Sequence, residues 1–164
     1  MRQAGTDQLL VSSLLDRLLD DDPALTREVS KSRTQLLCDL KQSVRRDLEN
    51  LLNTRRCCAV WPAHLEELER SLVSYGIPDI TSTGLGTAAA RDDFRRAVED
   101  VIRQFEPRFT SVAVEMVENA EPVDRTLRFR IRALLRAEPA PEPVVFDSML
   151  QPATGNIEVR GTNR

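Results

Sequence analysis

The sequence is poor in the residues that build metal centres and disulfide frameworks. It has three cysteines and one histidine among 164 residues. An odd cysteine count without regular spacing argues against a disulfide framework, and a structural zinc site normally takes four ligands. Cys57 and Cys58 are adjacent, and Cys38 falls on a predicted helix. We therefore expect reduced thiols, a cytosolic location, and neither a metal ion nor a cofactor.

Long apolar runs are also missing, so no stretch is expected to span a membrane. The segment Met1–Gln8 is polar and lacks the apolar core of a signal peptide. The formal net charge is −3, and this balance gives no indication of nucleic-acid binding. We expect neither direct membrane insertion nor a nucleic-acid partner.

Recognisable catalytic motifs are absent as well, among them G-x-S-x-G, Walker A and H-E-x-x-H. His64 stands at a predicted helix start, where a surface or capping role is favoured over catalysis. Gly84 and Gly86 lie in a loop without the strand and helix that flank a phosphate site. Glu106 has Arg108 beside it, which favours the ionised carboxylate and is unsuited to a general acid. No catalytic residue is predicted, and the protein is not expected to be an enzyme.

The composition is that of an ordinary globular domain, with 41% hydrophobic and 30% charged residues. A chain of this length can bury a hydrophobic core without disulfides or metal. We predict a single domain over residues 1–164, with short flexible tails at about 1–8 and 160–164.

Apolar residues recur at helical spacing through the first two thirds of the chain. The spacing predicts helices over about 9–19, 30–54, 63–74 and 88–105. Ser30 or Ser32 is the expected cap of the second helix. In the third, Leu65 and Leu72 are expected to point inward, and Trp61 just before it is expected in the core.

The period changes from helix to strand after residue 105. Alternation predicts strands over about 112–116, 127–135, 144–150 and 156–159. These strands follow one another too closely for crossover helices, which favours an antiparallel sheet. The sequence therefore predicts an α+β fold, with N-terminal helices packed on one face of a C-terminal antiparallel sheet of about four strands.

The triplet Glu106-Pro107-Arg108 marks the point where the last helix ends and the first strand begins. Pro107 explains the end of the helix. Glu106 faces the negative end of the helix dipole, and Arg108 can offset that cost by pairing with it. Two interpretations stay open: a charged recognition point at a rigid corner, or a pair that only fastens the corner to the fold.

The segment Tyr75-Gly76-Ile77-Pro78-Asp79 predicts a structural turn. Gly76 can adopt a positive φ at the end of a helix, and Pro78 prevents the helix from continuing. Tyr75 and Asp79 flank these two residues.

Two groups of arginines stand out. Arg45 and Arg46 lie on the polar side of the long helix, as solvated or ion-paired residues or as a docking surface. Arg128, Arg130 and Arg132 share one strand face, where like charges repel unless they are paired. Glu115 of the neighbouring strand is expected to face one of them. The alternative is an interface for an acidic partner.

Four segments together resemble signatures of the TssE family, the baseplate subunit of the bacterial type VI secretion system. They are Ser43–Arg55, Tyr75–Asp79, Phe105–Arg108 and Val144–Ser148. The family is similar to small baseplate wedge proteins of contractile phages, once labelled lysozyme-like. The resemblance covers about Leu14–Val159 and places the family's Glu-Pro-Arg motif on Glu106, Pro107 and Arg108. One departure is Phe109, where the family often has leucine.

The resemblance implies a non-enzymatic subunit that docks in the baseplate wedge and initiates polymerisation of the contractile sheath. The implied partners are the wedge subunits TssF, TssG and TssK and the sheath subunits TssB and TssC, with the spike hub as a further candidate. Assembly would be six-fold, in the cytoplasm, at a baseplate docked on the inner membrane. The Arg45–Arg46 helix face would meet the wedge, and the corner and a sheet edge would meet the sheath by strand addition. A peptidoglycan hydrolase and a small adaptor that regulates proteolysis are the alternatives.

Overall fold

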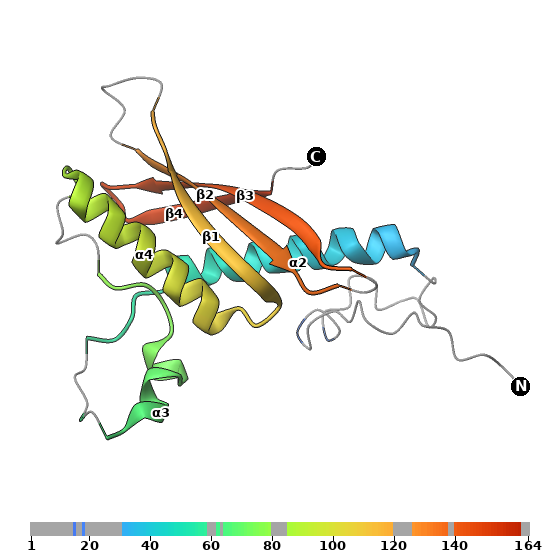
Figure 1. Ribbon diagram of the computed structural model, residues 1–164, viewed down its shortest axis with the longest axis horizontal. Coiled ribbons are helices and arrows are strands. Elements are labelled where there is room, and N and C mark those ends of the chain that lie inside the picture. Colours follow the sequence, from blue (N-terminus) through green and yellow to red (C-terminus); the bar gives the residue numbers. More distant parts are fainter. Residues whose placement is uncertain are drawn as a thin grey trace, which may run out of the picture.

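The computed structural model describes residues 15, 18, 31–58, 62, 64–79, 85–119, 126–137 and 140–161 (Figure 1). Its helical elements are α2 (Arg33–Asn53), α3 (Glu66–Glu69), the 3₁₀ turn η1 (Leu72–Ser74) and α4 (Ala88–Phe105). Its strands are β1 (Phe109–Val117), β2 (Leu127–Leu135), β3 (Glu142–Gln151) and β4 (Asn156–Gly161). The helix predicted over 9–19 lies outside the described residues except for Leu15 and Leu18, which are helical and exposed. Trp61 also lies outside them.

Helix α2 begins with a capping box. The backbone N–H of Gln35 donates to the Ser32 hydroxyl at 3.3 Å, and the Ser32 N–H donates to the Gln35 side chain at 2.8 Å. These two bonds satisfy donors that have no partner inside the helix, which selects Ser32 over Ser30 as the cap. The buried face of α2 carries leucines and a valine at helical spacing, as the sequence predicts.

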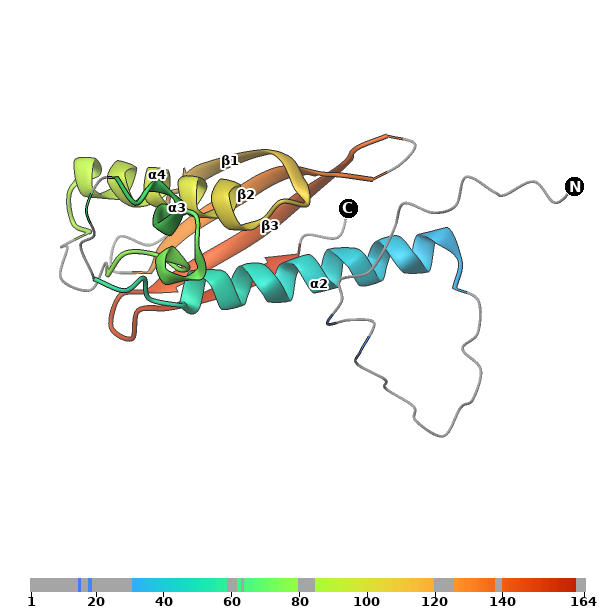
Figure 2. The ribbon, with the colours of Figure 1, turned by 90° about the horizontal axis from the view of Figure 1, so that it is seen from below.

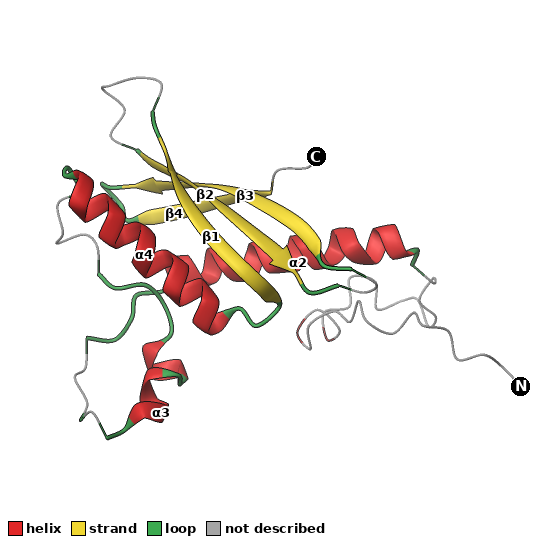
Figure 3. Cartoon of the chain, in the orientation of Figure 1, coloured by secondary structure: helices red, strands yellow, loops and turns green. Residues whose placement is uncertain are grey.

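The four strands form one antiparallel sheet in the order β1-β2-β3-β4. Side chains alternate between a buried and an exposed face along β2, from Leu127 to Leu135. Helix α4 packs on β1 and α2 packs on β4, and Figure 1 shows both helices on the same side of the sheet. Figure 2 shows the long helix α2 running beneath the strands, and Figure 3 distinguishes the helices in red from the strands in yellow. The predicted α+β fold is confirmed.

The hydrophobic core lies between the two long helices and the covered face of the sheet. Phe94 of α4 meets Phe129 of β2 edge to face, with ring centroids 5.6 Å apart. The opposite face of the sheet, which we call the open face, carries no described helix. This arrangement leaves Arg128, Arg130 and Arg132 of β2 on the open face.

The continuous helix predicted over 63–74 is wrong. The segment forms the four-residue α3 and then η1, and Leu65 and Leu72 are 40% and 84% exposed rather than inward. Ser71 interrupts the helix, because its hydroxyl donates to the Leu68 carbonyl at 2.8 Å and accepts from the Val73 N–H at 3.3 Å. A serine that bonds to nearby backbone competes with helical hydrogen bonds in this way.

The other boundaries are close to the prediction. The bounds of β2 coincide with it, and α4 ends at Phe105, immediately before Glu106. Strand β1 starts earlier than predicted, at Phe109, and β3 starts at Glu142, so that Pro143 belongs to the strand. The division into one domain with two tails stays a prediction.

Candidate functional site

The predicted corner is a sharp joint between α4 and β1. The Glu106 N–H still donates to the Ile102 carbonyl at 2.9 Å, and the Phe109 N–H donates to the Glu106 carbonyl at 3.3 Å. Glu106 is only 5% exposed, Pro107 is exposed, and Phe109 is buried at the start of β1. Of the three residues of the motif, Pro107 is therefore the one that faces solvent.

Arg108 ties this corner to α2. Its Nε donates to Glu106 Oε1 at 2.6 Å, and its Nη2 contacts the second carboxylate oxygen. The same Nη2 donates to Asp47 Oδ2 at 2.7 Å, and Nη1 lies 3.4 Å from the Ser43 hydroxyl. We call Ser43, Asp47, Glu106 and Arg108 the corner network. The local pairing of Glu106 with Arg108 is confirmed, and the connection to Asp47 was not predicted.

The electrostatics of the network hold Arg108 in its charged form. Burial alone lowers the pKa of the Arg108 guanidinium, but the hydrogen bond and charge of Glu106, followed by those of Asp47, outweigh it. The net effect raises the pKa of Arg108 above its ordinary value. One carboxylate from α2 and one from the joint after α4 thus share one guanidinium, an arrangement that holds the two helices together.

The geometry of Glu106 does not suit glycosidic bond cleavage. Its carboxylate accepts hydrogen bonds from the Arg108 side chain and, at 3.3 Å, from the Arg108 backbone N–H. A general acid must instead present a proton to its substrate, from a cleft that holds a second carboxylate at a set separation. The geometry of Glu106 therefore gives no support to the alternative of a peptidoglycan hydrolase.

The turn at Tyr75–Asp79 lies beside the corner. The Tyr75 ring meets Phe105 edge to face at 5.3 Å, and a hollow of about 340 Å³ lies between this pair and the corner network. Burial, and then the negative charges of Asp47 and Glu106, raise the pKa of the Tyr75 phenol. Two motifs that are 27 or more positions apart in the sequence are thus one structural region.

Gly76 explains how the turn fits against α2. Its φ is +103°, and a Cβ at this position would lie 2.4 Å from the Thr54 carbonyl oxygen. The Ile77 N–H donates to that carbonyl at 3.0 Å, and the Arg56 N–H donates to the Ile77 carbonyl at 2.8 Å. Pro78 and Asp79 are exposed. The geometry required of a turn glycine is therefore present.

Arg45 and Arg46 point to different surroundings although they are adjacent on α2. Arg45 pairs with Glu49 at 3.0 Å and donates to the Val159 carbonyl of β4 at 3.2 Å. Arg46 lies 3.5 Å from Asp47, at the border of the corner network. The structure supports the intramolecular ion-pair interpretation for Arg45 and does not unite the two side chains into one basic patch.

Both outer strands have backbone groups capped by helix side chains. On β1, Arg103 of α4 donates to the Val112 carbonyl and Glu99 accepts from the Val114 N–H, both at 3.1 Å. On β4, Asn53 of α2 accepts from the Ile157 N–H at 2.8 Å and donates to the Ile157 carbonyl at 2.7 Å. Such caps protect an edge from pairing with other strands. The sequence carries no signal for these contacts.

The open face carries the arginines of β2 in ion pairs. Arg132 pairs with Glu115 at 3.0 Å, and Arg130 pairs with Asp147 at 2.7 Å. The predicted pairing of Glu115 with one of these arginines is confirmed. These side chains are 40–55% exposed.

Other chemistry finds no support in the described part of the chain. Within it, no three side chains of the metal-ligating kinds gather, and the cysteines at 38, 57 and 58 are free and exposed. His64 is exposed too. None of the described helices combines the length and apolar character that crossing a bilayer requires.

Comparison with known proteins adds two findings. The family model of the baseplate wedge protein gp25 matches residues 38–140. A chain from a solved structure described as "The baseplate complex from the type VI secretion system" is 22% identical, with a TM-score of 0.47, over 69% of this chain and 95% of that chain. None of the curated proteins matches. The family range includes the corner network and the turn.

Proposed function

We propose, from the premise that this chain belongs to the baseplate wedge protein gp25 family, that it is a structural subunit of a type VI secretion baseplate. The observation that carries the proposal is the family match over residues 38–140. The TssE-like segments support it, and three of the four lie wholly inside that range. In this role the protein docks in the wedge and initiates the contractile sheath.

The corner network gives this role a mechanical basis. Arg108 fixes the angle at which β1 leaves α4, and through Asp47 it fixes α2 against the same joint. The sheet is thereby held in one orientation relative to both helices. A subunit that sets the position of the first subunits of a polymer must hold its contact surfaces rigidly. Any error in its orientation would otherwise be passed on to the subunits that bind to it.

The partners follow from the same proposal. The wedge side involves TssF, TssG and TssK, and the sheath side involves TssB and TssC, with the spike hub as a further contact. Within the predicted site, Pro107 is exposed and the side chains of Arg45 and Arg46 are 34% and 36% exposed, whereas Glu106 is buried. Copies around a six-fold ring would add avidity to weak single contacts. The location would be the cytoplasm, at a baseplate docked on the inner membrane.

The test is sheath assembly in cells that lack this protein, followed by fluorescence of a tagged sheath subunit. We expect sheaths to disappear on deletion and to return with the wild-type chain. Normal sheath assembly after deletion would contradict the proposal.

A series of variants then tests whether Glu106 and Arg108 hold the fold together or bind a partner subunit. Arg108→Glu is compared with Arg56→Glu, a charge reversal at an exposed position outside the corner. Circular dichroism of each purified variant reports the fold. A folded Arg108→Glu variant that fails to assemble sheaths makes the corner a recognition site, and an unfolded one assigns Glu106 and Arg108 to fastening.

A further inference from the structure

The sequence before α2 contains a stripe of leucines that the described fold does not cover. The leucines stand at positions 9, 10, 14, 15, 18 and 19, which is helical spacing. Leu15 and Leu18 belong to the described residues, are helical, and are 56% and 79% exposed. Because they stand three positions apart, they share one face of a helix. An apolar helix face is stabilised by packing against a second apolar surface, so we searched the fold for that surface.

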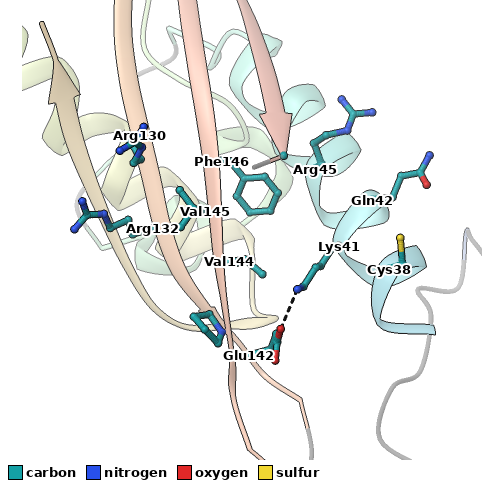
Figure 4. Close-up of a pocket in the computed structure, with 12 residues that line it drawn as sticks. Cys38, Lys41, Gln42, Arg45, Arg130, Arg132, Glu142, Val144, Val145 and Phe146 are labelled. Atoms are coloured by element: carbon teal, nitrogen blue, oxygen red, sulfur yellow. Dashed lines mark hydrogen bonds and ion pairs between the residues drawn. The ribbon is translucent and has the colours of Figure 1, made fainter. Parts of the chain in front are cut away.

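A groove lies between the first turns of α2 and the start of β3 (Figure 4). We call it the β3 groove, and its volume is about 720 Å³. Strand β4 pairs with residues 146–151 of β3, so no described strand lies between α2 and residues 142–145. Lys41 of α2 reaches Glu142 at 2.9 Å, as the dashed line in Figure 4 shows, and Cys38 lies one turn before Lys41. The groove is therefore close to the point where the chain enters α2.

The wall that β3 contributes to the groove is apolar and matches the leucine stripe in length. Proline, valine and phenylalanine side chains line it over residues 143–146. Residues 142–145 extend over about 13 Å at the usual rise of a strand. A helix over residues 9–19 would be about 16 Å long. The groove thus offers an apolar surface of about the length that the leucine stripe requires.

The groove and the segment before α2 carry opposite charges. The lining contains four cationic side chains and one carboxylate, that of Glu142. Lys41 pairs with Glu142, the other three cations pair with carboxylates outside the lining, and all four are 34–55% exposed. Residues 1–30 contain six acidic and three basic residues, and three consecutive aspartates at 20–22 follow the leucine stripe directly. Electrostatic complementarity therefore favours this segment as the occupant of the groove.

The connection between the leucine stripe and α2 is long enough for the segment to fold back. Pro23 cannot continue a helix, so the predicted helix and α2 are separate elements. Twelve residues, 20–31, join Leu19 to Ser32, the cap of α2. Fully extended, they would span about 40 Å, whereas Lys41 lies only about 14 Å along α2 from Ser32. The stripe can therefore reach the groove of its own chain.

This connection also favours the chain's own segment over other occupants. A short linker holds the tethered group near its site at an effective concentration of about a millimolar. A second copy of the chain, or another protein with a similar apolar helix, would have to reach that concentration in free solution to compete. Intramolecular docking is therefore the arrangement that the length of the linker supports.

We propose that residues 9–19 dock as a helix in the β3 groove of their own chain. Leu15 and Leu18 then face the apolar wall of β3, and the aspartates at 20–22 lie near Lys41 and Arg45. The docked helix covers the groove and excludes other proteins from it. The proposal does not depend on the proposed function, because it concerns two surfaces of a single chain.

The test uses the full chain and the reactivity of its own thiols. Cys38 lines the groove and is exposed when the groove is empty, whereas the exposed Cys57 and Cys58 lie outside the lining and serve as references. The rate of reaction with a maleimide is measured at each site by mass spectrometry. In the double variant Leu15→Asp, Leu18→Asp we expect Cys38 to react about ten-fold faster than in the wild type, because the docked helix no longer shields it. The rates at Cys57 and Cys58 should not change.

A matched control and a charge variant separate the contributions. Ser13→Asp with Arg17→Gln changes the net charge by the same amount as the double leucine variant. Both positions stand two residues from Leu15, on the opposite side of a helix, so Cys38 should react no faster than in the wild type. Asp21→Lys with Asp22→Lys replaces attraction to the cationic lining by repulsion and should raise the Cys38 rate about three-fold. Circular dichroism checks that each variant is folded.

Equal Cys38 rates in the wild type and in the double leucine variant would overturn the inference, because the groove would then be open in both. Shielding of Cys38 that increases with protein concentration would make the segment of a second copy the occupant, and would overturn it too. Shielding that is the same at about 1 and 100 μM protein, and that is lost with the two leucines, is the result we expect from a tethered segment.

Discussion

The corner network and the open face of the sheet both pair arginines with carboxylates, at distances of 2.6–3.0 Å. They differ in their surroundings. Glu106 in the corner is 5% exposed, and the arginines of the open face are 40–55% exposed. The same chemical pair therefore occurs in two different environments in one protein.

This difference shows which charges the protein can use for recognition. A buried carboxylate that loses its cation keeps its charge in a medium of low dielectric constant, which is strongly unfavourable. An exposed arginine that changes partner exchanges one solvated contact for another, at a cost of about 0–1 kcal/mol. The corner is thus suited to fixing geometry, and the open face is suited to reversible contacts.

The largest expected effect is the loss of the corner cation. Arg108→Met leaves Glu106 buried without its cation, and we expect a loss of about 3 kcal/mol in the free energy of unfolding, measured by urea denaturation. Arg132→Met is the matched control on the open face, with an expected loss below about 1 kcal/mol. Equal losses in the two variants would remove the distinction between the regions.

The next effect tests the turn that packs beside the corner. Gly76→Ala places a Cβ 2.4 Å from the Thr54 carbonyl oxygen at a φ of +103°, and should cost about 2 kcal/mol or more. Gly86→Ala is the control, because a Cβ there meets nothing within 4 Å and its φ lies outside the left-handed range. Its unfolding free energy should change by less than about 1 kcal/mol. Similar melting curves for both variants would contradict the expected strain.

A smaller effect is expected for the pair Arg130–Asp147 on the open face. A double-mutant cycle with Arg130→Ala and Asp147→Ala should give a coupling of about 0.5 kcal/mol, which falls as salt is added. A coupling above about 2 kcal/mol, insensitive to salt, would place this exposed pair in the same class as the corner.

The smallest effect concerns pH. Hydrogen bonding from Arg95, the largest cause, lowers the pKa of the half-exposed Asp92 carboxyl, and its partial burial only partly opposes this. A lowered folded pKa contributes stability that is present above the ordinary aspartate value near 3.9 and is lost as pH falls through the lower folded value. Asp92→Asn should therefore flatten the acid limb of the stability curve slightly. A larger change near neutral pH would contradict this assignment.

Sequence reasoning succeeded where the signal is local and periodic. The alternation from Leu127 to Leu135 predicted the bounds of β2, and Pro107 predicted the end of α4. The pairing of Glu106 with Arg108 could also be predicted, because only Pro107 separates the two charged residues. The failure at Ser71 has a local cause too, since a hydroxyl bonded to backbone outweighed the leucine spacing.

The rest of the site depends on contacts that the linear sequence does not reveal. Asp47 joins the corner across 61 positions, and Asn53 caps β4 across 104. Nothing in the residues around either position distinguishes it from an ordinary polar residue on the outer side of a helix. The sequence also does not reveal that β4 pairs with only residues 146–151 of β3, because this depends on the register between the two strands.

The packing of α2 on β4 also has a consequence for the order in which the chain folds. Each strand of the sheet pairs with its neighbour in sequence, so the hairpins can form as they are synthesised. Helix α2 is the first long described element, but its contacts with β4 close loops of 104 and 114 residues. Its leucine face therefore leaves the ribosome well before the strand that covers it exists. We expect α2 to pack on the sheet late in folding. Until then, we expect chaperones to bind its exposed leucine face.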